Sequence, residues 1–260
     1  MQQKTVSFKK REKIMGNYFD AHTHLQMMPD LKKTMENALK KGVCGFICNS
    51  TGPDDWDKVA AISLKYSQVI PCYGVHPHYI ENLPNDWFEN LKLLLQKDNF
   101  AMVGEIGLDN LKPNMDKQEQ ILRQQLELAW KLKRPAHIHC VRAWDRLLHV
   151  FKSQREKMPP KLLMHSHHGN PGLIAELIKK YNAYFSYSAI FLPENRVKIK
   201  ACMKVTPLDR IMIESDAPDL TAEPADIVGL TEKMSIITGH RKDILTRALF
   251  ENTKEFVYGN

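Results

Sequence analysis

Histidine and carboxylate side chains gather in six short motifs along the chain. The motifs are DAHTHL at 20–25, GVHPH at 74–78, GEIGLD at 104–109, HIHC at 137–140, MHSHHG at 164–169 and ESDAP at 214–218. Each lies at the end of a short apolar run of the kind that forms a buried strand. Because neutral imidazoles and carboxylates are common ligands of divalent ions, the motifs predict a metal site assembled from several strands.

The spacing within the first motif supports this prediction. His22 and His24 stand at positions i and i+2, so in a strand both imidazoles point to the same side and can face one ion. A carboxylate on a neighbouring strand can bridge two ions, so we expect two divalent cations, with zinc, magnesium and manganese all compatible. The six expected ligands are His22, His24, Glu105, His139, His165 and Asp216. His137 is expected to face away from this centre and to be packed or paired.

The elements that carry the motifs alternate between short apolar runs and longer amphipathic ones. The expected strands are Tyr18–Leu25, Gly45–Ser50, Val69–Val75, Phe100–Leu108, Ala136–Cys140, Lys161–His165, Tyr184–Ser188 and Ile211–Ser215, with helical patterns between them. This alternation predicts an α/β fold, a (β/α)₈ TIM barrel in which the carboxyl ends of the strands meet on one face. An open doubly wound sheet is the main alternative, but its glycine-rich phosphate loop does not occur here.

Composition and length agree with one domain at 18–260. The chain has 260 residues, of which 43% are hydrophobic and 26% charged, as in ordinary globular proteins. No apolar run reaches the length needed to span a bilayer, and we expect no membrane association and no obligate protein partner. An odd number of cysteines, five, argues against a disulfide framework and indicates a reducing compartment, so a cytoplasmic location is expected.

Positive charge is concentrated at the start of the chain. The net charge is +7, and residues 1–17 carry five cations and one acid, which leaves +3 for the rest. We expect residues 1–17 to form a disordered basic arm that is able to contact phosphates. The charge of the remaining chain is too small to indicate nucleic-acid binding by itself.

Taken in order, the motifs resemble those of the TatD family of metal-dependent hydrolases, which includes TatD-type deoxyribonucleases. The matching segments are FDAHTHL, GVHPH, VGEIGLD, QLELAWKLKRPAHIHC, MHSHHG and IESDAP, and they extend from residue 19 to 218. The resemblance implies a TIM barrel that hydrolyses phosphodiester bonds, with DNA as the substrate. Val141 with Arg142, His167, and the segment Ala222-Glu223-Pro224 depart from the family pattern, and all are expected near the substrate rather than among the ligands.

The resemblance also implies a role for each site residue. His22, His24 and Asp216 would bind the first ion, His139 and His165 the second, and Glu105 both. His76 and His78 would face the substrate. On chemical grounds, Asp216 also accepts the proton of the attacking water, and Asp20 supports the ligands from behind them.

Two other functions use the same features. An amidohydrolase acting on a small amide, ester or lactone needs the same ligands, since activated water attacks carbonyl carbon as well as phosphorus. Phosphate substrates would favour cations near the metals, for which Arg142, Arg196 and Lys198 are candidates by sequence. A catalytically inactive nucleic-acid-binding protein is the second alternative, and six intact ligands argue against it.

Overall fold

A computed structural model describes residues 17–259 of the chain. Eight strands lie in sequence order in one sheet, and each is parallel to the next. The strands are β1 (Tyr18–Thr23), β2 (Val43–Asn49), β3 (Val69–Tyr73), β4 (Met102–Asp109), β5 (Ala136–Val141), β6 (Leu162–Met164), β7 (Ala183–Tyr187) and β8 (Ile211–Ile213). All eight predicted strands are therefore confirmed. The basic arm predicted at 1–17 lies, apart from Asn17, outside the described residues.

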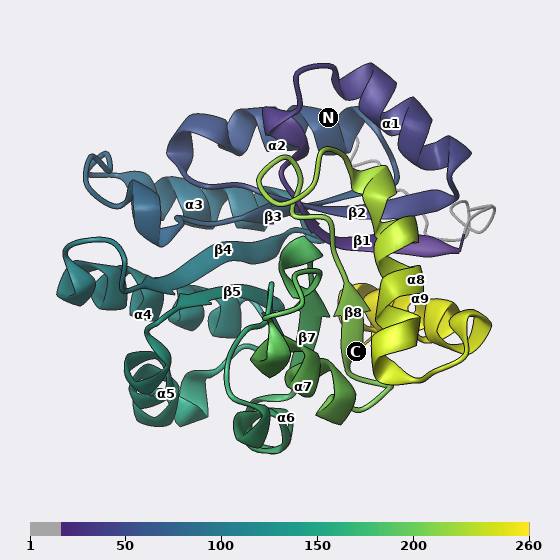
Figure 1. Cartoon of the computed structure of the whole chain (residues 1–260). Coiled ribbons are helices and arrows are strands. Elements are labelled where there is room, and N and C mark those ends of the chain that lie inside the picture. Colours follow the sequence, from purple (N-terminus) through teal and green to yellow (C-terminus); the bar gives the residue numbers. More distant parts are fainter. Residues whose placement is uncertain (1–16, 260) are drawn as a thin grey trace.

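Helices surround the strands, and α8 and α9 lie beside β8 (Figure 1). They are α1 (Leu31–Lys40), α2 (Pro53–Lys65), α3 (Trp87–Lys97), α4 (Met115–Lys131), α5 (Trp144–Ser153), α6 (Ile174–Tyr181), α7 (Val197–Val205), α8 (Ile227–Thr238) and α9 (Lys242–Tyr258). Local sequence sets the ends of α1. The Asp30 side chain accepts a hydrogen bond from the Lys33 N–H at 3.0 Å, and Gly42 follows the helix with φ of 82°, a backbone conformation that glycine adopts without strain.

The first and last strands meet at a seam that closes the sheet. Backbone hydrogen bonds join Asp216 N to His22 O at 3.0 Å and His24 N to Ala217 O at 2.8 Å. Below them, the Asp20 carboxylate accepts hydrogen bonds from the backbone N–H and the hydroxyl of Ser215, at 2.9 and 2.5 Å. This closure confirms the barrel and excludes the open doubly wound sheet.

The lower part of the barrel interior, at the amino ends of the strands, is apolar. Phe19, Tyr184 and Met212 point into it and are buried. Phe256 of α9 is completely buried among them and packs edge-on against Tyr184, with 5.4 Å between the ring centroids. The last helix therefore closes this end of the barrel, which we call the floor.

The cysteines are free and buried, as the sequence indicated. Cys44 and Cys48 are thiols within β2, so this pair forms neither a disulfide nor a metal clip. None of the helices within residues 17–259 combines the length and apolarity that crossing a bilayer requires.

Candidate metal centre

The six predicted ligands converge at the carboxyl ends of the strands, which we call the mouth of the barrel. His22 and Glu105 lie on β1 and β4, and His139 lies on β5. His24 and His165 follow directly after β1 and β6, and Asp216 lies three residues beyond the end of β8. Parallel strands thus bring to one face side chains that are nearly 200 residues apart in the chain.

Four of these side chains form a first group at the seam between β1 and β8. His22 Nε2 lies 3.2 Å from Glu105 Oε2 and 3.8 Å from Asp216 Oδ1. His24 Nε2 lies 3.5 and 3.4 Å from the same two oxygens. The other nitrogen of His24 is 2.8 Å from the Asn49 carbonyl oxygen, which directs Nε2 toward the carboxylates.

A second group lies on the opposite side of Glu105. His139 Nδ1 and His165 Nε2 are each 2.8 Å from Glu105 Oε1 and 3.2 Å from one another. The two oxygens of one carboxylate therefore face different groups, Oε2 the first and Oε1 the second. This is the arrangement expected of a residue that bridges two cations.

The packing of β4 against β5 makes the second group possible. Gly107 pairs with His139 in the two strands, and a side chain at Gly107 would collide with the His139 carbonyl oxygen. Glycine at this place lets the strands approach closely, so that Glu105 and His139, from adjacent strands, reach the same point. This explains the second glycine of the GEIGLD motif.

Contacts between the imidazoles and carboxylates of the two groups shift the pKa values of their members. Burial alone would raise the pKa of Glu105, but His165, His76 and His22 outweigh it and hold that pKa well below its usual range. Burial would likewise lower the pKa of His24, yet its contacts with Asp216 and Glu105 raise it to about 9. At Asp216, the hydrogen bond with His24 and the nearby charge of His22 outweigh burial and lower the pKa to about 2. Without ions, protons on the histidines thus offset the buried carboxylates.

The residues present fit divalent cations. The ligand atoms of His22, His24 and Glu105 lie within 4.8 Å of one another, as do those of Glu105, His139 and His165. Asp216 forms a further such set with His22 and His165. A cation is the partner that such a convergent set of lone pairs lacks. The chemistry of the donors, nitrogen and oxygen without sulfur, suits zinc, manganese or a related ion.

Two acidic residues that the sequence analysis did not single out support the second group from behind. His139 Nε2 and His165 Nδ1 are buried without a hydrogen-bond partner among the described residues, and each faces a carboxylate. Asp109 Oδ2 lies 3.6 Å from the former and Glu214 Oε1 lies 3.4 Å from the latter. Carboxylates behind ligating imidazoles orient the rings and raise their basicity. The sequence did offer a signal for Asp109 and Glu214: both acids stand at the ends of apolar strand segments, and a buried acid needs a polar partner.

The two histidines of the GVHPH motif lie next to the second group. His76 Nε2 is 3.3 Å from Glu105 Oε1, and burial lowers the pKa of His76 to about 3. His78 Nε2 is 2.6 Å from Asp109 Oδ2 and is partly exposed at the rim. A short 3-10 turn, Pro77–Tyr79, positions both side chains after β3.

Asp20 acts mainly on the backbone. Besides Ser215, its Oδ1 accepts a hydrogen bond from the His22 N–H at 3.3 Å. Burial raises the pKa of Asp20 well above its usual range, although hydrogen bonds from Ser215 oppose the shift. The contacts of Asp20 show it holding the seam and the main chain of a predicted ligand, not the imidazole rings.

The prediction that His137 faces away from the centre is wrong. His137 and His139 are two residues apart on β5, so both side chains point into the barrel. His137 lies one layer lower, with Nδ1 3.4 Å from His22 Nδ1 and its ring edge-on to Phe256 at 5.4 Å. Its expected packing is confirmed, and the packing partners lie inside the barrel.

His167 also occupies an apolar site. Its ring packs against Phe185 and Trp144 at centroid distances of 4.8 and 5.2 Å, and neither nitrogen has a hydrogen-bond partner among the described residues. Burial lowers its pKa to about 3, so the ring is neutral. His167 therefore belongs to the packing and contributes no ligand to either group.

Comparison with known proteins agrees with this geometry. Residues 19–258 match the model of a family described as TatD related DNase. The chain belongs to this family. The TatD-related fold is also that of YjjV, the TatD homologue from Escherichia coli, whose crystal structure aligns with a TM-score of 0.86 at 22% identity, covering 94% of this chain and 98% of that one.

Two human relatives show the range of activities reported for TatD-related proteins. Deoxyribonuclease TATDN3 from Homo sapiens is 26% identical over 224 residues, covering 78% of this chain and 79% of that protein. The 3′-5′ RNA nuclease TATDN2 from Homo sapiens is 27% identical over 222 residues, covering 77% of this chain. The match spans only 28% of the length of TATDN2.

Proposed function

We propose that this TatD-related protein is a metal-dependent nuclease that hydrolyses phosphodiester bonds of single-stranded DNA from the 3′ end. The observation that carries the proposal is Glu105, whose two oxygens face two separate ligand groups. The relatives support the type of bond, because one is a deoxyribonuclease and the other a 3′-5′ RNA nuclease.

Six side chains would hold two divalent cations. His22, His24 and Asp216 would bind one cation, His139 and His165 would bind the other, and Glu105 would bind both. Bound there, the cations would supply Lewis acidity that acidifies water and offsets charge on the phosphoryl oxygens. Zinc, magnesium and manganese are the candidate ions.

Asp216 would accept the proton of the attacking water. Its Oδ1 lies 3.4 Å from His24 Nε2 in the first group, at the mouth of the barrel. The left-handed backbone at Asp216, with φ of 51°, directs the side chain back over the seam. A carboxylate in contact with the reacting water takes up the proton in the transition state.

His76 and His78 would position the phosphate. The Nε2 of His76 points at Glu105 from the side opposite Asp216, and its lowered pKa keeps the ring neutral. A neutral imidazole there would donate a hydrogen bond through Nε2 to a phosphoryl oxygen, since Nδ1 accepts one from the His78 N–H at 3.2 Å. Asp109 would hold His78 at the rim for a second contact with the substrate.

The test is hydrolysis of a single-stranded DNA oligonucleotide labelled at its 5′ end, with Mn²⁺, Mg²⁺ or Zn²⁺ added separately. The expected result is stepwise shortening that requires metal, and a loss of at least about 1,000-fold in rate for Asp216→Asn. Asp57→Asn, an exposed change on α2, is the matched control and should leave the rate unchanged.

Other outcomes would point elsewhere. Full metal binding without cleavage of any strand, together with turnover of a small ester or lactone, would assign the centre to an amidohydrolase. Tight strand binding with neither activity would indicate an inactive nucleic-acid-binding protein. A cytoplasmic location and the absence of an obligate protein partner remain predictions, and size-exclusion chromatography of the purified protein checks the second.

A further inference from the structure

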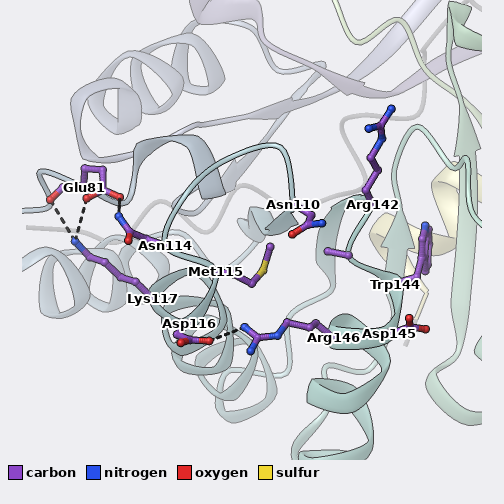
Figure 2. A pocket seen from close by; sticks show the side chains of 11 residues that line it. Glu81, Asn110, Asn114, Met115, Asp116, Lys117, Arg142, Trp144, Asp145 and Arg146 are labelled. Carbon is purple, nitrogen blue, oxygen red and sulfur yellow. Dashed lines mark hydrogen bonds and ion pairs between the residues drawn. The ribbon is translucent and has the colours of Figure 1, made fainter.

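A polar groove opens beside the candidate metal centre, between the loops that follow β4 and β5. Its volume is about 1080 Å³, above the range of about 300–1,000 Å³ typical of small-ligand sites. Asn110, Asn114, Arg142 and Trp144 are among the residues that line it (Figure 2). We refer to it as the β4–β5 groove.

Two strand ends link the residues of the β4–β5 groove to those of the metal centre along the chain. Asp109, which contacts His78 at 2.6 Å, directly precedes Asn110, and the Asn110 N–H donates to Val141 O at 2.9 Å. Arg142 follows Val141, three residues beyond His139 on the same chain segment. Two residues that line the groove thus lie one and three residues along the chain from Asp109 and His139.

Charge pairing leaves one cation of the groove free. Lys117 pairs with Glu81 at 3.9 Å, and Arg146 pairs with Asp116 at 2.6 Å. Within residues 17–259, Arg142 forms no hydrogen bond through its side chain and no ion pair, and the side chain is exposed. Figure 2 shows it extending away from Asp116 and Arg146.

The backbone at Arg142 adds to this picture. Its φ of 50° lies in the left-handed region, which residues other than glycine rarely adopt. The chain turns there, directly after β5, and Arg142 is one of the residues that line the groove. A planar guanidinium with its donors free is well suited to phosphate, which it binds through two parallel hydrogen bonds.

Trp144 supplies an aromatic surface on the same wall. The indole is half-buried, and one edge packs against His167 with 5.2 Å between ring centroids. The rest of the ring lines the groove (Figure 2). Aromatic surfaces next to a cation are the usual elements of single-strand binding, because every base can stack and every linkage carries a phosphate.

We infer that the β4–β5 groove binds the part of a single strand that adjoins the bond being hydrolysed. Arg142 binds the phosphate of a neighbouring nucleotide, and Trp144 stacks on its base. The inference rests on the proposed nuclease function and adds to it a preference for strands longer than the metal centre alone can hold.

Binding of a fluorescein-labelled phosphorothioate DNA strand of about 10 nucleotides, measured by fluorescence anisotropy over a range of salt, tests the groove. Arg142→Ala should weaken binding about tenfold and reduce the slope of log K against log salt by about 0.7, the value for one phosphate contact on a single strand. Arg155→Ala removes an equally exposed arginine beyond the far end of α5 and should change neither quantity.

A second pair of variants tests the stacking surface. Trp144→Phe keeps an aromatic ring, whereas Trp144→Leu removes it, so only the leucine variant should weaken binding, by about fivefold or more. Thermal unfolding of both variants shows whether the packing on His167 survives. Equal affinities for all Arg142 and Trp144 variants and the wild type would overturn the inference.

Cleavage of the unmodified strand separates the two proposals. If the wild type cleaves DNA and Arg142→Ala binds as tightly as the wild type, the groove is wrong and the nuclease function stands. If the wild type binds the strand in a manner dependent on Arg142 but hydrolyses none, the groove stands and the nuclease function fails.

Discussion

The two ends of this barrel are built from the same strands and have opposite chemistry. At the mouth, His139 lies among carboxylates, and although burial opposes it, Asp109 and Glu105 raise its pKa. At the floor, His137 lies two residues earlier on β5 beside Phe256, and burial lowers its pKa well below the usual range. Histidine is thus a candidate metal ligand in the upper layer of the interior, at His139. In the layer below, at His137, it is a neutral packing group.

The difference teaches that carboxylates define the centre. Histidines occur in both layers, but Glu105 and Asp216 occur only in the upper one, where they face five imidazole nitrogens, those of His22, His24, His76, His139 and His165. The floor offers aromatic and aliphatic side chains instead. Chemistry and stability should therefore separate along the barrel axis, and four predictions test this separation.

The largest effect is expected from Glu105→Gln at the mouth. The amide keeps the shape but loses the charge that both groups share, so both ions should be lost and activity should fall at least about 1,000-fold. Metal content by mass spectrometry and the rate of DNA hydrolysis measure this. Glu255→Gln, near the floor in contact with Lys161, is the control and should keep metal and activity. An active Glu105→Gln protein with two ions would refute the bridging role.

At the floor, Phe256→Ala should destabilise without inactivating. Removing a completely buried aromatic ring leaves a cavity and costs about 3–5 kcal/mol in the free energy of unfolding. Urea unfolding measures the loss, and Phe100→Ala, whose ring is 49% exposed, should cost less than about 1 kcal/mol. A large fall in the specific activity of the folded Phe256→Ala protein would show that the two ends are not separate.

Asp109→Asn should weaken metal binding without abolishing it. The carboxylate faces His139 Nε2 from behind, and loss of such a partner lowers metal affinity about 10–100-fold. Titration of the metal-free protein with zinc, followed by calorimetry, should show the weaker step for one ion of the two. Unchanged affinities at both steps would leave Asp109 with no role beyond holding His78.

The smallest effect concerns the buried thiols Cys140 on β5 and Cys202 on α7, which report how closely the helices pack around the strands. Burial raises the pKa of Cys202 to about 11 and that of Cys140 to about 12. Reaction with a disulfide reagent needs the thiolate, so native protein should react slowly at pH 8 and faster as the pH rises toward 11. Denatured protein should react at all five thiols at pH 8. Rapid reaction of the native protein at pH 8 would show an open interior.

Much of the fold was accessible from the sequence because its signals are local. Eight apolar runs, alternating with amphipathic ones, mark the strands, and Asp30 and Gly42 mark the ends of α1. The strand ends were less certain. The run Ile211–Ser215 is strand only to Ile213, because the chain turns toward the seam before Asp216.

The convergence of the six candidate ligands was predictable for a related reason. Strand periodicity puts His22 and His24 on one side, and barrel topology brings the ends of all strands to one face. The same periodicity applies to His137 and His139, and the prediction that separated them failed because it did not apply the rule to β5. Their different surroundings depend on depth in the barrel, which no local pattern reports.

The sequence by itself determined which residues can bind cations and which elements carry them, since residue type and period-two spacing are properties of the chain. Only the tertiary structure decided that Glu105 faces both groups, that Asp109 and Glu214 stand behind their histidines, and that Arg142 is left unpaired above a groove. These facts depend on contacts between side chains far apart in sequence, and such contacts exist only once the barrel has closed.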